Sequence, residues 1–184
     1  MNKTVIILIF ICRVLYGQRA DFFKEDITFR LDSVHFSTEG YYWFSNTSDK
    51  PVHSNIYYPF PNFSNEKIDS VHIFNISAGA DVKYIKEEDH GISFNLFLGP
   101  NDTVLFQIGY RQKLQSDSAV YILRTTKGWG KPLNTAEYNL IISKNFVIKK
   151  FSYPPLKSYN IKNKKIYIWR MKNFMPIYDM IFHF

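Results

Sequence analysis

Apolar residues recur at every second position along most of the chain, and this alternation limits the possible folds more than any other feature. Ile27, Phe29 and Leu31, for example, alternate with polar residues. Successive side chains of a strand point to opposite faces, so this period predicts strands with one buried face. No amphipathic helical pattern exceeds two turns. Further alternating sets are Val52, Ile56, Tyr58 and Phe60; Val104, Phe106, Ile108 and Tyr110; Tyr121 and Leu123; and Ala136, Tyr138, Leu140 and Ile142.

Turn-forming residues separate these apolar runs. Val34 and Phe36 continue the first run in the opposite parity, which predicts a β-bulge near Asp32 and Ser33. Roughly ten short strands without βα alternation predict an all-β fold, an antiparallel β-sandwich of immunoglobulin-like or jelly-roll-like type. Residues 18–184 form a single domain in this interpretation. The turn signals are at Thr38–Gly40, Asn46–Pro51, His90–Gly91, Gly99–Asp102, Lys127–Pro132 and Tyr153–Pro155.

The first seventeen residues are typical of a signal peptide. Lys3 precedes an unbroken apolar run, Val5–Cys12, and Arg13 ends it. Eight residues are far fewer than the ~20 that cross a bilayer as a helix. Cleavage after Gly17 predicts export to the periplasm or the extracellular space, with no transmembrane helix after signal removal. An uncleaved anchor is the alternative.

Cysteine usage limits both the chemistry and the compartment. Cys12 is the only cysteine of the chain and lies within the predicted signal peptide. The mature domain therefore has no thiol for catalysis, metal binding or disulfides. An exported domain without disulfides is more typical of a bacterial envelope than of an animal extracellular fluid.

The sequence contains no recognisable catalytic motif. The five histidines never occur as His-x-His or His-Glu-x-x-His, so we expect no metal site. We find neither a nucleophile elbow nor a phosphate-binding glycine loop, and we expect no cofactor and no catalytic residues. The pI of about 9.3 does not predict nucleic-acid binding, because an exported protein rarely meets that partner.

Two aromatic segments are the best candidates for a binding site. Tyr57, Tyr58 and Phe63 lie in a proline-rich stretch, and Trp129 lies between two glycines. If exposed, these rings could stack on a glycan or anchor an envelope protein. The alternative is that Trp129 folds back and plugs one end of the sandwich.

Several short motifs resemble an uncharacterised family, a domain of unknown function, of exported bacterial all-β proteins. The similar stretches run in order between Ile27 and Phe184, although this chain is shorter between its halves. The resemblance implies export and an all-β fold and implies no catalytic residue. The motifs are Phe44–Val52, Tyr58–Pro61, Tyr121–Thr125, Trp129–Pro132 and Tyr138–Ile142.

Three functional hypotheses follow from these features. The first is an exported, non-enzymatic β-sandwich of the bacterial envelope that acts as a binding or structural module. The second is a small eight-stranded outer-membrane β-barrel, because Tyr178, Met180, Phe182 and Phe184 alternate at the C-terminus as in the assembly signal of such barrels. The third is an envelope enzyme acting on glycan or peptide.

Overall fold

The computed structural model describes residues 20–61, 67–87 and 91–184. The predicted signal peptide and Phe63 lie outside these ranges. The elements in chain order are β1 (Asp21–Leu31), β2 (His35–Ser45), β3 (Val52–Pro59), β4 (Lys67–Asn75), β5 (Ala80–Asp81), β6 (Tyr84–Glu87), β7 (Gly91–Leu98), β8 (Thr103–Lys113), β9 (Ser118–Tyr121), the 3-10 helix η1 (Arg124–Trp129), β10 (Leu133–Ser143), β11 (Lys150–Phe151), β12 (Lys157–Ile161), β13 (Lys164–Phe174) and β14 (Met180–His183).

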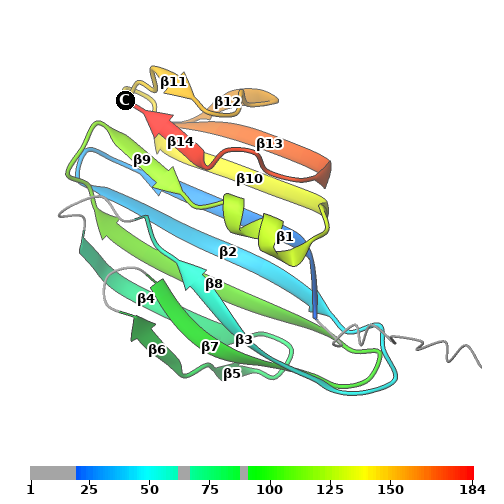
Figure 1. The fold of residues 1–184 in the computed structure, drawn as a ribbon. Helices are drawn as coiled ribbons and strands as arrows, with labels where there is room; N and C mark the ends of the chain where they lie inside the picture. Colours follow the sequence, from blue (N-terminus) through cyan, green and yellow to red (C-terminus); the bar gives the residue numbers. More distant parts are fainter. Residues whose placement is uncertain (1–19, 62–66, 88–90) are drawn as a thin grey trace, which may run out of the picture.

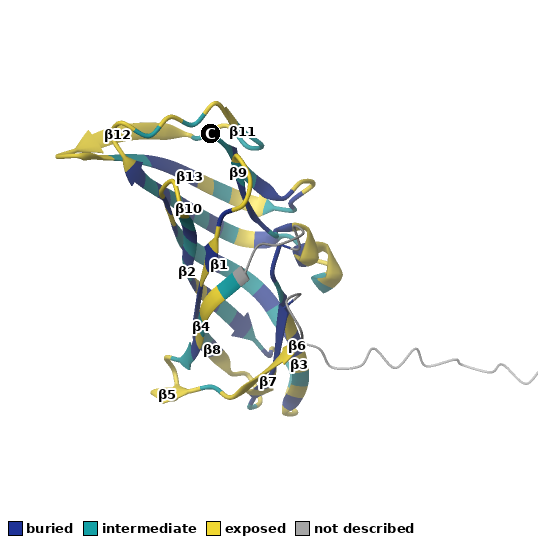
Figure 2. Cartoon of the chain, turned by 90° about the vertical axis from the view of Figure 1, so that its left-hand side faces the viewer, coloured by how far each residue is buried: buried dark blue, intermediate teal, exposed yellow. Residues whose placement is uncertain are grey.

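The strands form one large sheet and two small ones (Figure 1). The large sheet has eight strands in the order β12-β13-β10-β1-β2-β8-β4-β5. The small sheets have the orders β11-β14-β9 and β3-β7-β6. In the view of Figure 2, both small sheets lie on the same side of the large one. The chain is therefore a β-sandwich, which confirms the predicted fold class.

The core fills the space between the large sheet and the two small sheets. Phe182 of β14 packs against Phe29 of the large sheet, with ring centroids 5.4 Å apart. Phe94 of β7 packs against Phe106 of β8 at 5.5 Å. Every residue in the alternating sets of the sequence is buried, as the period of two requires. Each small sheet thus covers a different part of the same apolar face.

The sandwich differs from the predicted one in its pairing and strand lengths. β1 and β10 pair in parallel, although all the other pairings are antiparallel among the described strands. Alternation reveals which face of a strand is buried but carries no information about its direction. Five strands have eleven residues, so the description "short" does not fit them.

Two local predictions for the first strands are wrong. The change of parity after Leu31 is not a bulge within one strand but the tight turn between β1 and β2. Asp32 closes this turn, because its Oδ1 accepts hydrogen bonds from the backbone N–H groups of Val34 and His35, each at 2.7 Å. The residues Thr38–Gly40, interpreted as a turn, lie within β2.

The large sheet is open, which contradicts the hypothesis of an eight-stranded closed barrel. Its edge strands β12 and β5 do not pair with each other in the described ranges. The aromatic alternation near the C-terminus has another cause. Met180 and Phe182 are fully buried, so this part of the pattern reflects the packing of β14 against the large sheet, whereas Tyr178 precedes β14 and is exposed.

In the described ranges, none of the helical segments combines the length and the apolar character that a membrane-spanning helix requires.

Candidate functional site

A pocket of about 490 Å³ opens beside η1 and β3 and reaches down to β1 and β2. Its rim contains exposed residues such as Asn55, Tyr57 and Thr125, whereas its floor contains buried ones such as Glu25 and Ile108. The pocket lies between elements of both small sheets, because β3 belongs to one of them and Tyr121 ends β9 of the other. It therefore occupies the gap that the two small sheets leave over the large sheet.

A bulge in β1 shapes the floor of this pocket. Phe22 pairs with Phe44 of β2, but Lys24 pairs with Trp43, so β1 has one more residue than β2 at this point. The extra residue changes the parity of the strand, and Phe22 and Glu25 both face the core. Both side chains line the pocket.

Glu25 is the buried carboxyl group of the pocket. Only 2% of its surface is exposed, and its Oε1 accepts a hydrogen bond from the hydroxyl of Tyr138. Burial raises the pKa of Glu25 from 4.5 to about 7, while the hydrogen bond from Tyr138 acts in the opposite direction. The carboxyl group is therefore poised to gain or lose a proton near neutral pH.

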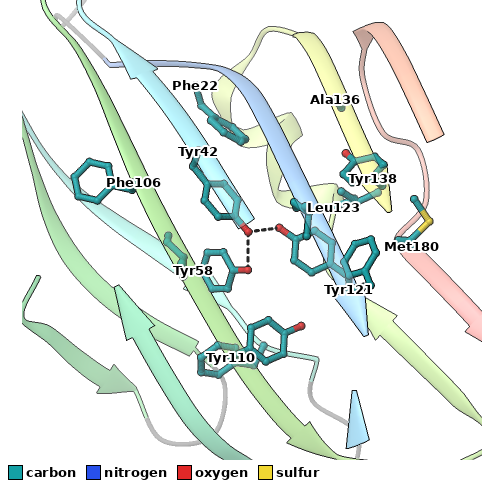
Figure 3. Close-up of a cluster of buried hydrophobic side chains, with 14 of the residues drawn as sticks. Phe22, Tyr42, Tyr58, Phe106, Tyr110, Tyr121, Leu123, Ala136, Tyr138 and Met180 are labelled. Atoms are coloured by element: carbon teal, nitrogen blue, oxygen red, sulfur yellow. Dashed lines mark hydrogen bonds between the residues drawn. The ribbon is translucent and has the colours of Figure 1, made fainter. Parts of the chain in front are cut away.

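Three tyrosine hydroxyls form a buried chain at the pocket wall (Figure 3). The hydroxyl of Tyr42 lies 2.9 Å from that of Tyr58 and 2.9 Å from that of Tyr121. Burial raises the pKa of Tyr58 to about 12 and raises the pKa values of Tyr42 and Tyr121 well above 10. All three hydroxyls consequently stay protonated at neutral pH and can share hydrogen bonds with one another or with a ligand.

A glycine in β2 makes room for the central tyrosine. Gly40 faces the core, and a Cβ atom at this position would collide with the ring and hydroxyl of Tyr42. The ring of Tyr42 thus lies over the backbone of its own strand. The sequence pattern Gly-x-Tyr explains how the hydroxyl of Tyr42 reaches strands from both small sheets.

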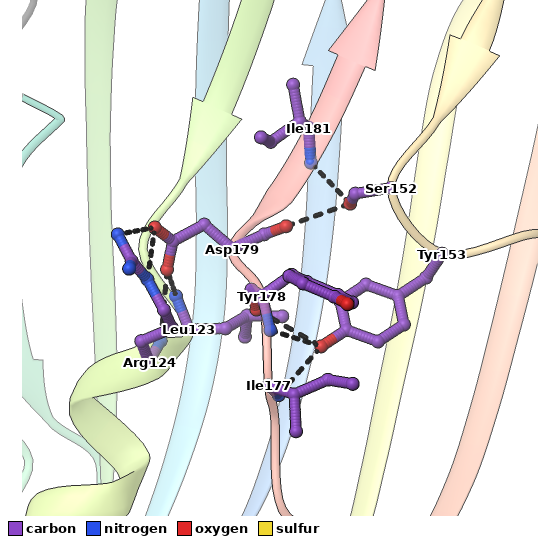
Figure 4. Close-up of polar contacts among 8 residues, drawn as sticks. All are labelled: Leu123, Arg124, Ser152, Tyr153, Ile177, Tyr178, Asp179 and Ile181. Carbon is purple, nitrogen blue, oxygen red and sulfur yellow. Dashed lines mark hydrogen bonds and ion pairs between the residues drawn. The ribbon is translucent and has the colours of Figure 1, made fainter.

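The wall formed by η1 is fixed to the segment just before β14 through a buried aspartate, Asp179 (Figure 4). Asp179 Oδ1 accepts hydrogen bonds from the backbone N–H groups of Leu123 and Arg124, at 3.0 and 3.1 Å. Its Oδ2 pairs with the guanidinium of Arg124 at 2.9 Å. These contacts hold the start of η1, whose last residue is Trp129.

Three of the four residues that the sequence singled out come together in this pocket. Tyr57, Tyr58 and Trp129 all line it, whereas Phe63 lies outside the described residues. Tyr57 is 45% exposed, but Tyr58 is buried. Binding of a ligand by these residues stays a prediction.

Trp129 contacts both the core and the pocket. It is half-buried, and its ring packs 5.8 Å from that of Phe22 and 5.6 Å from that of Phe44. Its ring therefore covers part of the core in the gap between the two small sheets, and its role in binding stays a prediction.

Sequence reasoning overlooked Glu25, although a signal was present. Glu25 has the same parity as Ile27, Phe29 and Leu31, so extending that alternation by one step places a carboxyl group on the buried face. A charged residue on such a face is rarely buried without a partner. The same strand thus carries the core pattern and the ionisable group of the pocket.

Potential metal ligands do not cluster in the described ranges. No group of three or more His, Cys, Asp or Glu side chains there is arranged to hold a metal ion. Chemistry in this pocket would instead depend on the Glu25 carboxyl group, the tyrosine hydroxyls and the aromatic rings.

Comparisons with known proteins extend the description of the fold. No family model and no curated protein sequence matches the chain. Among solved structures, a candidate nutrient binding protein of Legionella pneumophila aligns with a TM-score of 0.69 and 12% identity over 89% of this chain. The M1 zinc metallopeptidase of Deinococcus radiodurans, in its E323A mutant bound to Tyr-Ser-Ala, aligns with a TM-score of 0.59 and 12% identity, also over 89%.

These matches cover only part of the other proteins. The chain spans 66% of the Legionella protein and 42% of the metallopeptidase. At such low identity the likeness shows a shared fold and no shared activity.

Proposed function

We propose that this protein is a non-enzymatic binding module whose pocket between η1 and β3 holds a small organic molecule. The observation that carries the proposal is the pocket itself, which runs from exposed rim residues to a buried carboxyl group. Its volume of about 490 Å³ falls in the range of small-molecule sites, ~300–1,000 Å³. Such sites are mostly apolar and carry a few polar groups that orient the ligand, as Glu25 and the tyrosine chain would here.

The comparison with solved structures supports this proposal in one respect. The Legionella pneumophila protein shares the fold and is a candidate nutrient binding protein, which is compatible with a binding role for this chain. The likeness to the metallopeptidase does not favour peptidase activity, because the sequence lacks the His-Glu-x-x-His pattern of metallopeptidases.

We place this module in the bacterial cell envelope, as the signal-peptide pattern and the resemblance to exported proteins suggest. Mass spectrometry of protein expressed with its own N-terminus in a bacterial host measures this directly. A mature chain that begins at Gln18 in the periplasmic fraction is the expected result. An unprocessed chain in the cytoplasmic fraction would contradict it.

The binding proposal is tested with a neutral fluorescent probe, N-phenyl-1-naphthylamine, whose emission rises in an apolar pocket. Thr125→Trp adds a large side chain at the exposed rim and should block the pocket. Lys127→Trp is the matched control, because Lys127 is also exposed on η1 but does not line the pocket. Thermal melts of both variants establish that they remain folded.

The expected result is saturable probe binding by the wild type and by Lys127→Trp, with a loss of at least about tenfold in affinity in Thr125→Trp. Equal binding by all three proteins would place the probe elsewhere and would contradict a pocket function. Failure of the wild type to bind the probe would contradict it as well.

A further inference from the structure

We propose that the ligand of this pocket carries a positively charged nitrogen, an ammonium or quaternary ammonium group, that sits against Glu25 and the surrounding aromatic rings. This inference rests on the proposed binding function and specifies the class of ligand. Three features support it: the charge of the pocket, the arrangement of its aromatic rings and the position of Glu25.

The pocket excludes basic residues although the protein is basic. The chain has 23 lysines and arginines and a formal net charge of +7, yet no lysine, arginine or histidine lines the pocket in the described ranges. Glu25 is its one acidic residue among those ranges. A carboxylate at the end of a mainly apolar pocket without a basic partner attracts a cation and repels an anion.

The aromatic rings that line the pocket together with Glu25 suit the same ligand. Phe22 and Phe44 stack with centroids 5.2 Å apart, and Trp129 packs against both. Tyr42 and Tyr58 add two further rings to the lining. Aromatic faces carry partial negative charge and attract quaternary ammonium groups, most strongly where water is excluded.

Glu25 makes this recognition dependent on pH. The neighbouring titratable groups are Tyr138 on β10, Tyr42 on β2, Tyr58 on β3 and Tyr121 on β9, and burial keeps all four neutral by raising their pKa values.

The charged residues nearest in sequence do not face Glu25. Lys24 and Asp26 flank it on β1, so alternation directs them to the opposite face, and Arg124 and Lys127 on η1 do not line the pocket. Because burial raises the pKa of Glu25 to about 7, affinity for a permanently charged ligand should rise as pH increases through that value.

The test compares two probes of the same shape, choline and 3,3-dimethylbutan-1-ol, which differ in one positive charge. Binding of each to the wild type and to Glu25→Gln is measured by isothermal titration calorimetry at pH 6 and pH 8. Thr125→Trp reports whether binding is in the pocket, and thermal melts establish that each variant is folded.

The expected result is that the wild type at pH 8 binds the ammonium probe about tenfold or more tightly than the neutral probe. This preference should shrink at pH 6 and disappear in Glu25→Gln, because the amide carries no charge at either pH. If the wild type binds both probes equally, or prefers the neutral one, the cation inference is overturned while the binding function stands. If neither probe binds in a pocket that binds N-phenyl-1-naphthylamine, the cation inference is overturned while the binding function stands.

Discussion

The hydroxyl of Tyr138 on β10 donates a hydrogen bond to the carboxyl group of Glu25 on β1, across the one parallel strand pair among the described strands. Both side chains are almost completely buried. The pair therefore joins the centre of the large sheet to the floor of the pocket. Protonation of the Glu25 carboxyl group therefore affects both the stability of the fold and the charge of the pocket.

Glu25→Gln should change how stability depends on pH. The pKa of Glu25 is 4.5 when unperturbed and about 7 in the folded protein. Between these values the folded state holds a proton that the unfolded state has lost, so the free energy of unfolding falls as pH rises. Above pH 7 this ionisation lowers the free energy of unfolding by roughly 3 kcal/mol, because each unit of pKa difference corresponds to ~1.4 kcal/mol.

Urea denaturation of the wild type and of Glu25→Gln at several pH values between 4.5 and 8 measures this effect. The wild type should lose stability relative to the variant across the range, because glutamine does not titrate. Subtracting the two curves removes the contribution of every other titratable group that the mutation leaves unchanged. Parallel curves would show that Glu25 has an ordinary pKa in the folded state.

Tyr42→Phe should destabilise the protein more than Tyr121→Phe does. The hydroxyl of Tyr42 contacts both of the other hydroxyls, whereas that of Tyr121 has one such hydrogen bond. At ~1 kcal/mol for each hydrogen bond, Tyr42→Phe should cost about 2 kcal/mol and Tyr121→Phe about 1 kcal/mol. Urea denaturation at pH 7 measures both, and equal losses would argue against the central position of Tyr42.

Gly40→Ala should be destabilising although alanine is a small residue. The added methyl group would displace the ring of Tyr42 from its place over β2. Overpacking of a core costs ~1–3 kcal/mol, and here it would also disturb the hydroxyl chain. Gly128→Ala is the control, because a Cβ atom there meets no atom within 4 Å. A Gly40→Ala variant as stable as Gly128→Ala would refute the packing argument.

The sequence predicted most of the strand faces because burial of one face leaves a period of two. It did not predict the parallel pairing of β1 with β10, since strand direction depends on how distant segments meet. Gly40 was interpreted as a turn signal because glycine is common in turns. In this chain it is a strand residue whose missing side chain makes room for the ring of Tyr42. The sequence pattern does not show this, because it does not show where the Tyr42 ring lies.

The candidate site was predicted in part for a similar reason. The sequence predicted Trp129 and Tyr57 as candidate binding residues because they are aromatic and lie in glycine-rich or proline-rich segments, and both line the pocket. The sequence could not show that they share it, because they are far apart along the chain. The alternation along β1 could have predicted that Glu25 is buried. Its hydrogen bond with Tyr138, however, depends on the parallel pairing of β1 with β10, which the pattern does not specify.

Asp179→Ala should loosen the pocket wall, whereas Arg124→Ala should change little. Asp179 is buried and accepts two backbone hydrogen bonds at the start of η1, so its removal leaves the N–H groups of Leu123 and Arg124 without that acceptor. We expect Asp179→Ala to lower the free energy of unfolding by about 2 kcal/mol or more. The side chain of Arg124 is 63% exposed, and an ion pair at such a position contributes little to stability.

The position of Trp129 distinguishes a loosened wall from general destabilisation. Trp129 ends η1 and packs on Phe22 and Phe44, so release of η1 should increase its exposure to water. The chain has three tryptophans, so both variants are made in a Trp43→Phe, Trp169→Phe background in which Trp129 is the one tryptophan left. Acrylamide quenching of its fluorescence, measured well below the melting temperature, should then increase in Asp179→Ala but not in Arg124→Ala. Equal quenching in the two variants would show that Trp129 is held by its ring contacts alone, and η1 would then need no support from Asp179.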